Sequence, residues 1–186
     1  MQRLIDIIFS IIAIFILFIP ILIIGILIKM SSKGPILYWS DRVGYKNDIF
    51  SMPKFRTMKI QTPELATNDL PNPETYITKI GYYLRRYSLD EIPQIICLIT
   101  GKMTLIGPRP ALFNQNDLIM LRTNNKIHML RPGITGYAQV NGRDQLSIEE
   151  KVNLEIYYKQ NKSFFLDIKI IILTVIKVFI KEGVSH

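Results

Sequence analysis

Cysteine and histidine are scarce in this sequence, which has one cysteine and two histidines among 186 residues. The lone cysteine, Cys97, excludes a disulfide framework and a cysteine-ligated zinc site. Cys97 lies in an apolar run, where a small core residue is expected more than a nucleophile. His128 and His186 are too few for a histidine metal cluster, so we expect any metal to be a hard cation held by oxygen atoms.

Acidic residues are outnumbered, with 15 against 23 lysines and arginines, and the formal net charge is +8. This balance indicates an anionic partner, which can be nucleic acid, an anionic lipid surface or a phosphorylated substrate. The sequence lacks a Walker phosphate loop, a dinucleotide-binding fingerprint and a nucleophile-elbow serine. Aromatic residues are not interleaved with the basic ones as on an RNA-stacking surface, so we expect no nucleic acid partner.

Charge is absent from one long stretch, the 22 residues from Ile7 to Ile28. At ~1.5 Å per residue a helix of this length reaches about 33 Å, close to the thickness of a bilayer core. The stretch is too long for a secretory signal, and no small-residue cleavage site follows it. The sequence therefore predicts that the chain contacts a membrane.

Two arrangements of this apolar segment remain open. Pro20 lies inside it, removes a backbone hydrogen bond and should kink the helix. Basic residues flank both ends, Arg3 before and Lys29 and Lys33 after, so the positive-inside rule gives no direction. Symmetric flanks suit a re-entrant helix over residues 1–32 that is broken at Pro20 and returns to the same face. Composition alone also suits a simple membrane span.

The middle of the chain places charged residues in an order suited to binding phosphate. Two arginines, two carboxylates and an arginine between two prolines follow one another: Arg85, Arg86, Asp90, Glu91, Pro108, Arg109 and Pro110. Ser88 with Glu91 is a capping-box pattern, whereas Asp90 as N-cap would keep Pro93 within the first helical turn. Either register puts both carboxylates at the positive end of a helix, which favours their ionised forms by about 0.3 to 1 kcal/mol.

An ionised Asp90 is a competent nucleophile towards phosphorus, and Glu91 beside it can hold Mg²⁺. Simple helix capping is the competing interpretation of this pair. Residues 49–58 form a predicted strand on which Phe50 and Met52 face inward. We expect Lys54 and Arg56 to share the other face of this strand. Two cations on one face can bind a diphosphate, and they can equally form a solvated edge of the sheet.

The remaining pattern predicts a mostly helical α+β fold with short strands and amphipathic helices. Helices are expected at 74–84, from 89 or 91 to 101, at 113–126, 147–160 and 164–181. Short strands are expected at 36–39 and 49–58, and residues 134–143 as a short strand that closes on a turn. Ser147 with Glu150 is a second capping box, at the start of the fourth of these helices. The last helix is apolar, with a polar arc on which Ile170 and Leu173 intrude. It is either the back wall of the core or an interfacial helix on anionic lipid.

Several of these stretches together resemble the small bacterial sugar transferases known as monotopic phosphoglycosyl transferases, which act on polyprenyl phosphate. The matching stretches are the Pro20-centred segment, Lys54–Met58, Ser88–Glu91, Gly107–Pro110 and Arg131–Arg143. Each motif is modest alone, but their order and spacing cover the chain from about residue 1 to 184. The chain departs from the family pattern at Ile19, which replaces a serine before Pro20, and at Thr104, which replaces another serine.

The resemblance implies Mg²⁺-dependent transfer of a sugar-1-phosphate from a UDP-sugar to polyprenyl (undecaprenyl) phosphate, with release of UMP. It makes residues 33–186 a catalytic domain on the cytoplasmic face of the bacterial inner membrane, in the first membrane step of glycoconjugate synthesis, with downstream glycosyltransferases as further partners. Asp90 would be the nucleophile that carries a covalent phosphosugar, Glu91 with Asp90 would hold Mg²⁺, and Arg109 would bind phosphate. Further implied phosphate-binding or assisting residues are Lys54, Arg56, Arg85, Arg131, Arg143 and Asp167.

Two other functions are compatible with parts of the pattern. A non-catalytic, membrane-anchored module would use its basic face for anionic lipid or a partner, with Asp90 and Glu91 as helix caps. A carboxylate-pair glycosidase is disfavoured, because its two acids act from opposite sides of a bond about 5 Å or more apart, which adjacent residues seldom do.

Overall fold

The computed structural model describes residues 2–63, 71–142 and 145–180, and its fold is a mostly helical α+β fold, as predicted. The helices are α1 (Gln2–Ser31), α2 (Lys79–Arg86), α3 (Ile95–Ile99), α4 (Asn116–Asn124), α5 (Tyr137–Val140), α6 (Ile148–Asn161) and α7 (Phe164–Ile180). The strands are β1 (Leu37–Val43), β2 (Ile49–Phe55), β3 (Thr104–Ile106), β4 (Ala111–Leu112) and β5 (Gly133–Thr135). Short 3₁₀ turns include η1 (Tyr45–Asn47), η4 (Leu89–Gln94) and η5 (Ile127–Met129).

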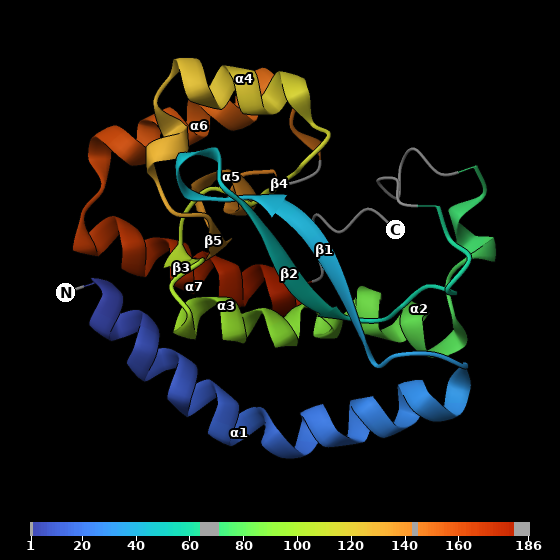
Figure 1. Ribbon diagram of the computed structural model, residues 1–186. Helices are drawn as coiled ribbons and strands as arrows, with labels where there is room; N and C mark the ends of the chain where they lie inside the picture. Colours follow the sequence, from blue (N-terminus) through green and yellow to red (C-terminus); the bar gives the residue numbers. More distant parts are fainter. Residues whose placement is uncertain (1, 64–70, 143–144, 181–186) are drawn as a thin grey trace.

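Two small sheets organise the domain. An antiparallel sheet has the order β2-β1-β4, and β3 pairs with β5 in parallel. Figure 1 shows β1 and β2 crossing the domain as a ribbon, with α4 and α6 on one side and α3 and α2 on the other. The register places Tyr38 opposite Lys54, and Arg42 opposite both Phe50 and Leu112. Strand pairing therefore brings Arg42 and Lys54 into one sheet.

Helix α1 continues through Pro20 as one helix, so the predicted break into two helical segments is not present, and the predicted kink is limited to a bend (Figure 1). Figure 1 shows α1 bent near its middle and running along the edge of the molecule, beneath α3 and α2. Pro20 and Ile19 are exposed on this helix. Among the described residues, α1 is the one helix long and apolar enough to cross a membrane.

The N-terminal half of α1 is tied to the domain by polar contacts. Arg3 donates to the backbone carbonyls of Leu98 and Ile99, at the end of α3. The buried carboxylate of Asp6 accepts hydrogen bonds from the Thr104 hydroxyl at 2.9 Å and from the Leu105 amide at 2.9 Å. These contacts attach the start of the apolar helix to β3.

The C-terminal half of α1 is attached to the same domain by apolar packing. Ile24 and Ile28 are buried in a cluster with Phe55 and Leu84. The carbonyl of Ser32, just past the helix, accepts from Arg56 Nη2 at 3.0 Å. Both ends of this long helix are therefore held by one globular domain.

Helix α7 covers another part of the core. Ile170 is fully buried, and it packs with Leu166 and Leu173 in the cluster that contains Tyr158. The Thr174 hydroxyl lies 2.6 Å from that of Thr135 on β5. Asp167 and Thr174 of the predicted polar arc, with the two intruding apolar residues, therefore face the domain, and α7 serves there as a wall of the core. Its other side is exposed and apolar, with residues such as Phe165, Ile172 and Val175.

The local sequence pattern predicted the start of α6 correctly but not the structure that follows β5. The capping box at Ser147 is confirmed, with both of its reciprocal hydrogen bonds to Glu150 present. Residues 134–143 were predicted as a short strand that closes on a turn, but β5 ends at Thr135 and the helix α5 begins at Tyr137. The Val140 amide donates to the Gly136 carbonyl at 3.1 Å and closes a helical turn that buries Ala138 and Val140.

Candidate active site

Asp90 and Glu91 lie in the first turn of η4. The predicted capping box at Ser88 is wrong, because Ser88 is left-handed (φ +53°) and its side chain makes no capping bond. An N-cap serine needs an extended backbone to place its hydroxyl on the next turn's amides. The element is a 3₁₀ helix of 6 residues rather than the start of a long α-helix. The turn η4 includes Pro93. The predicted conflict between Pro93 and an α-helix capped by Ser88 does not arise, because no such helix forms here.

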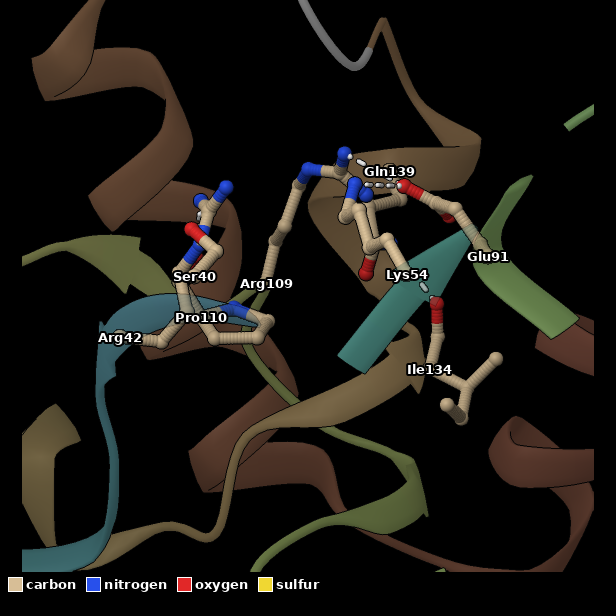
Figure 2. Close-up of polar contacts among 8 residues, drawn as sticks. All are labelled: Ser40, Arg42, Lys54, Glu91, Arg109, Pro110, Ile134 and Gln139. Carbon is tan, nitrogen blue, oxygen red and sulfur yellow. Dashed lines mark hydrogen bonds and ion pairs between the residues drawn. The ribbon is translucent and has the colours of Figure 1, made fainter. Parts of the chain in front are cut away.

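Glu91 lies at the centre of a cluster of cations (Figure 2). Its Oε1 atom lies 2.9 Å from Lys54 Nζ and 3.1 Å from Arg109 Nη2. The Lys54 and Glu91 side chains are 17% and 20% exposed, whereas that of Arg109 is 35% exposed. The three residues come from β2, η4 and the loop between β3 and β4, so only the folded chain brings them together.

Asp90 differs electrostatically from its neighbour. Burial raises the pKa of its carboxyl, Glu91 raises it further, and Lys54 and Arg85 act in the opposite direction. This opposes the expectation that a helix N-terminus keeps the pKa low, because the short 3₁₀ turn offers little dipole and burial dominates. A backbone hydrogen bond to the Asp90 carboxyl also acts to lower its pKa. Its carboxylate is therefore partly desolvated and close to cations.

Arg42 belongs to this site, although the sequence had not singled it out. Its Nε donates to Ser40 Oγ at 3.1 Å, and its Nη1 donates to the Pro110 carbonyl at 3.3 Å. Burial and the nearby Arg109 lower the pKa of Arg42 to about 10, while Glu91 acts against them. The contact with Pro110 depends on the pairing of β1 with β4, which no local signal in the sequence predicts.

The loop that carries Arg109 is fixed by backbone contacts. The Gly107 amide donates to the Thr135 carbonyl at 2.9 Å, and the Gly133 amide donates to the Pro108 carbonyl at 2.8 Å. A Cβ atom on Gly107 would lie 2.3 Å from the Arg131 carbonyl oxygen, so only glycine fits there. Arg109 therefore projects from a rigid corner.

Gln139 is a further polar residue near this corner. Its Nε2 donates to the Ile134 carbonyl at 3.0 Å, while its buried Oε1 has no hydrogen-bond partner among the described residues. Figure 2 shows its side chain beside Lys54 and Arg109. The sequence analysis had placed this residue in a strand and assigned it no role.

The predicted pairing of Lys54 with Arg56 on one outward face is wrong. Side chains two apart share a strand face, so Lys54 lies on the same face as the buried Phe50 and Met52. Arg56 follows the strand and is itself buried. Its guanidinium donates to the carbonyls of Ser32 and Lys33 and thus holds the segment after α1.

The remaining predicted site residues have separate surroundings. Arg85 is close enough to Asp90 to influence the pKa of that carboxyl. Arg131 is exposed and lies 6.0 Å from the centre of the Tyr45 ring. Asp167 accepts a hydrogen bond from the Tyr158 hydroxyl at 2.8 Å, and no contact among the described residues joins it to Glu91. Arg143 lies outside the described residues.

The two carboxylates of the site are compatible with Mg²⁺ binding when substrate phosphates are present. The described residues contain no group of three or more metal-ligating side chains. Mg²⁺ usually takes one or two protein carboxylates and completes its shell with phosphate oxygens and water. Asp90 and Glu91 supply that number of carboxylates.

Comparison with known proteins identifies the family. The family model described as bacterial sugar transferase matches residues 1–181. The chain belongs to this family. The cluster of Asp90, Glu91, Lys54 and Arg109 is therefore a site within a bacterial sugar transferase fold.

Several relatives of this bacterial sugar transferase have curated names. The uncharacterized sugar transferase EpsL of Bacillus subtilis is 39% identical over 161 residues, which are 86% of this chain and 77% of EpsL. The UDP-glucose:undecaprenyl-phosphate glucose-1-phosphate transferase of Escherichia coli is 37% identical over 86% of this chain and 36% of that protein. The exopolysaccharide production protein ExoY of Rhizobium meliloti is 34% identical over 90% of this chain and 80% of ExoY. The chain thus spans well under half of the E. coli relative but most of EpsL and ExoY.

Proposed function

We propose that this sugar transferase moves a sugar-1-phosphate from a UDP-sugar to undecaprenyl phosphate and releases UMP. The relatives named for glucose-1-phosphate transfer make UDP-glucose the first donor to test. The observation that carries the proposal is Glu91 held by Lys54 and Arg109, with the desolvated Asp90 carboxylate next to it. A purely capping role for these carboxylates would not require two cations from other elements.

The first half-reaction is attack by an Asp90 carboxylate oxygen on the phosphorus that bears the sugar. The new bond is a carboxylate–phosphorus bond, and the bond to the bridging oxygen of the UMP group breaks, so UMP leaves with the electron pair. Attack of one anion on another needs fixed positive charge nearby, which Lys54, Arg85 and Arg109 provide. Desolvation also makes the ionised Asp90 a stronger nucleophile than a hydrated carboxylate.

The second half-reaction returns the enzyme to its starting state. An oxygen of the lipid phosphate attacks the same phosphorus, forms the diphosphate link and displaces the Asp90 carboxylate. When Mg²⁺ is bound, it would neutralise phosphate charge beside Asp90 and Glu91. Arg109, held by its rigid corner, would keep the phosphate groups in place with little loss of conformational freedom.

The attachment of α1 supports a re-entrant rather than a spanning topology. A straight membrane span would place its two ends on opposite faces of the bilayer. The start of α1 is bonded to Leu98, Thr104 and Leu105, and its end packs on Phe55 and Leu84 of the same domain. The proposed arrangement keeps α1 in one leaflet, with α7 at the interface and the domain on the cytoplasmic face.

The test of the nucleophile is a mass measurement without the lipid acceptor. Purified protein incubated with Mg²⁺ and a panel of UDP-sugars should gain the mass of one sugar phosphate on the peptide that contains Asp90. Asp90→Asn should gain none, whereas Asp48→Asn, at an exposed aspartate, should react as the parent does. Turnover of a UDP-sugar by Asp90→Ala at the parental rate would exclude Asp90 as nucleophile.

The pH profile gives a second readout of Asp90. Because burial raises the pKa of this carboxyl, the rate of UMP release should fall on the acid side at a pH above the ordinary aspartate range. An acid limb at the pH of an exposed aspartate would contradict this role.

The topology is tested by labelling engineered cysteines at positions 2 and 33 in sealed vesicles. Labelling of both from the same side supports the re-entrant arrangement, and labelling from opposite sides excludes it. Burial raises the pKa of the native Cys97 thiol to about 11, so Cys97 should contribute little background.

A further inference from the structure

A second arginine, Arg42, lies beside Arg109 at the edge of the proposed active site. Figure 2 shows the two guanidinium groups pointing to the same side of the site. Arg42 comes from β1 and Arg109 from the loop between β3 and β4. The contact of Arg42 Nη1 with the Pro110 carbonyl, at 3.3 Å, joins these two segments.

Two hydrogen bonds fix the position of the Arg42 side chain. Ser40, which is 5% exposed, accepts from Nε at 3.1 Å, and Pro110 accepts from Nη1. Its third nitrogen, Nη2, has no hydrogen-bond acceptor among the described residues. A planar guanidinium held at two nitrogens offers its remaining donors in a set direction, which matches the geometry of a phosphate.

Charges of both signs act on Arg42. Arg109 repels it and Glu91 attracts it, but Glu91 is itself bonded to Lys54 and Arg109. The mutual effect of the two arginines is visible in the pKa of Arg42, which burial and Arg109 lower to about 10. An anion placed between the two guanidinium groups would remove this repulsion.

We propose that Arg42 and Arg109 form a two-arginine subsite for a phosphate group, with Ser40 as the residue that positions Arg42. This inference rests on the proposed function, because both substrates of that reaction carry phosphate. The group is either the diphosphate of the donor or the phosphate of the lipid acceptor. The chemistry of recognition is the same for both.

Steady-state kinetics distinguishes the two sources. In Arg42→Lys and Arg42→Ala, the KM of one substrate should rise about 10- to 100-fold, because a charge-assisted hydrogen bond to phosphate is lost. A rise for the UDP-sugar, with slower adduct formation in the absence of lipid, assigns the donor. A rise for undecaprenyl phosphate, with unchanged adduct formation, assigns the acceptor. Lysine should not rescue function, because it cannot hold Ser40 and Pro110 and also bind phosphate.

A binding measurement tests the subsite without turnover. UDP and inorganic pyrophosphate should raise the melting temperature of the parent protein, as ligands of the folded state do. The rise should be lost in Arg42→Lys and reduced in Ser40→Ala, which leaves the arginine in place but removes its Nε partner. Lys126→Gln, which removes an exposed positive charge on the loop after α4, should retain the full rise.

The outcomes separate this inference from the proposed function. If the parent transfers no sugar phosphate but loses its pyrophosphate response in Arg42→Lys, the proposed function fails and the subsite stands. If folded Arg42→Lys and Arg42→Ala keep both KM values and the pyrophosphate response within twofold of the parent, the subsite is wrong and Arg42 only braces Pro110. Should Arg42→Ala not fold, Arg42→Lys and Ser40→Ala decide between these outcomes.

Discussion

At the residue scale, Asp90 carries a charge that its surroundings oppose, because burial raises the pKa of its carboxyl. The folded protein therefore holds this proton more tightly than the unfolded chain does. Stability from this group is complete below the ordinary aspartate pKa and is lost as the pH rises through the raised value. At neutral pH the ionised side chain thus lowers the free energy of unfolding.

We expect Asp90→Asn to abolish transfer and, at neutral pH, to melt at a higher temperature than the parent. The difference should shrink as the pH is lowered into the range where Asp90 is protonated. Melting curves of both proteins across this pH range measure the effect, with Asp48→Asn as an exposed control. A lower melting temperature for Asp90→Asn at neutral pH would contradict the assigned desolvation.

Whether the sequence analysis found each site residue depended on the neighbours of that residue along the chain. The sequence analysis singled out Asp90 and Glu91 because they are adjacent carboxylates. It singled out Arg109 because prolines flank it on both sides. Lys54 was singled out with the wrong face, although the two-residue period of a strand already places it with Phe50 and Met52. Arg42 was missed, because its partner Pro110 lies 68 residues away.

At the element scale, α4 and α6 are joined by a buried ion pair between Arg122 and Glu155. Arg122 Nε lies 2.8 Å from Glu155 Oε2, and the two side chains are 11% and 4% exposed. Burial raises the pKa of Glu155, and Arg122 acts against this effect. Removal of one partner leaves the other as an uncompensated buried charge.

We expect Arg122→Met to lower the free energy of unfolding by about 3–5 kcal/mol. The double variant Arg122→Met with Glu155→Leu should recover most of this loss, because no buried charge remains. Urea unfolding in detergent measures both. Equal destabilisation by the single and double variants would show that packing, rather than charge, is lost.

A second element-scale prediction concerns the corner that carries Arg109. In Gly107→Ala, the new methyl group would meet the Arg131 carbonyl oxygen at 2.3 Å, and neither backbone can yield without moving Arg109. We expect lower stability and loss of transfer. The matched control is Gly25→Ala in α1, where the methyl group meets only Ile36 at 3.7 Å. That variant should be neutral or stabilised by up to ~1 kcal/mol, as for glycine to alanine in a helix.

Elements with local signals were predicted, and those that depend on tertiary contacts were not. The helix that begins after Ser147 was predicted because its capping box lies within four residues. Ser88 carries the same pattern, yet it adopts a left-handed conformation at the junction of α2 and η4. The direction in which α7 faces could not be predicted, because the side that contains the polar residues Asp167 and Thr174 contacts the domain, whereas a polar side usually faces solvent.

At the scale of the whole molecule, the attachment of α1 determines how the apolar helix lies against the domain. Asp6 supplies two acceptors to β3, and Arg3 supplies two donors to the end of α3. In Asp6→Ala, the Thr104 hydroxyl and the Leu105 amide lose these acceptors. We expect faster amide hydrogen exchange in residues 2–10 of this variant, with little change in residues 24–31.

Hydrogen exchange followed by mass spectrometry in lipid nanodiscs measures this prediction. Lys33→Gln, which changes an exposed charge just past α1, is the control and should exchange as the parent does. Uniform acceleration along the whole of α1 would mean that the two halves are released together. Unchanged exchange near the N-terminus would mean that the apolar contacts alone hold this half.

The attachment of Asp6 also sets an order of events during synthesis. Its partner Thr104 is 98 residues further along the chain. At roughly 5–20 residues per second, a ribosome delivers that partner about 5–20 s after it has added Asp6. During this interval the carboxylate must stay hydrated, which keeps the nascent segment near the aqueous boundary until β3 arrives and captures it.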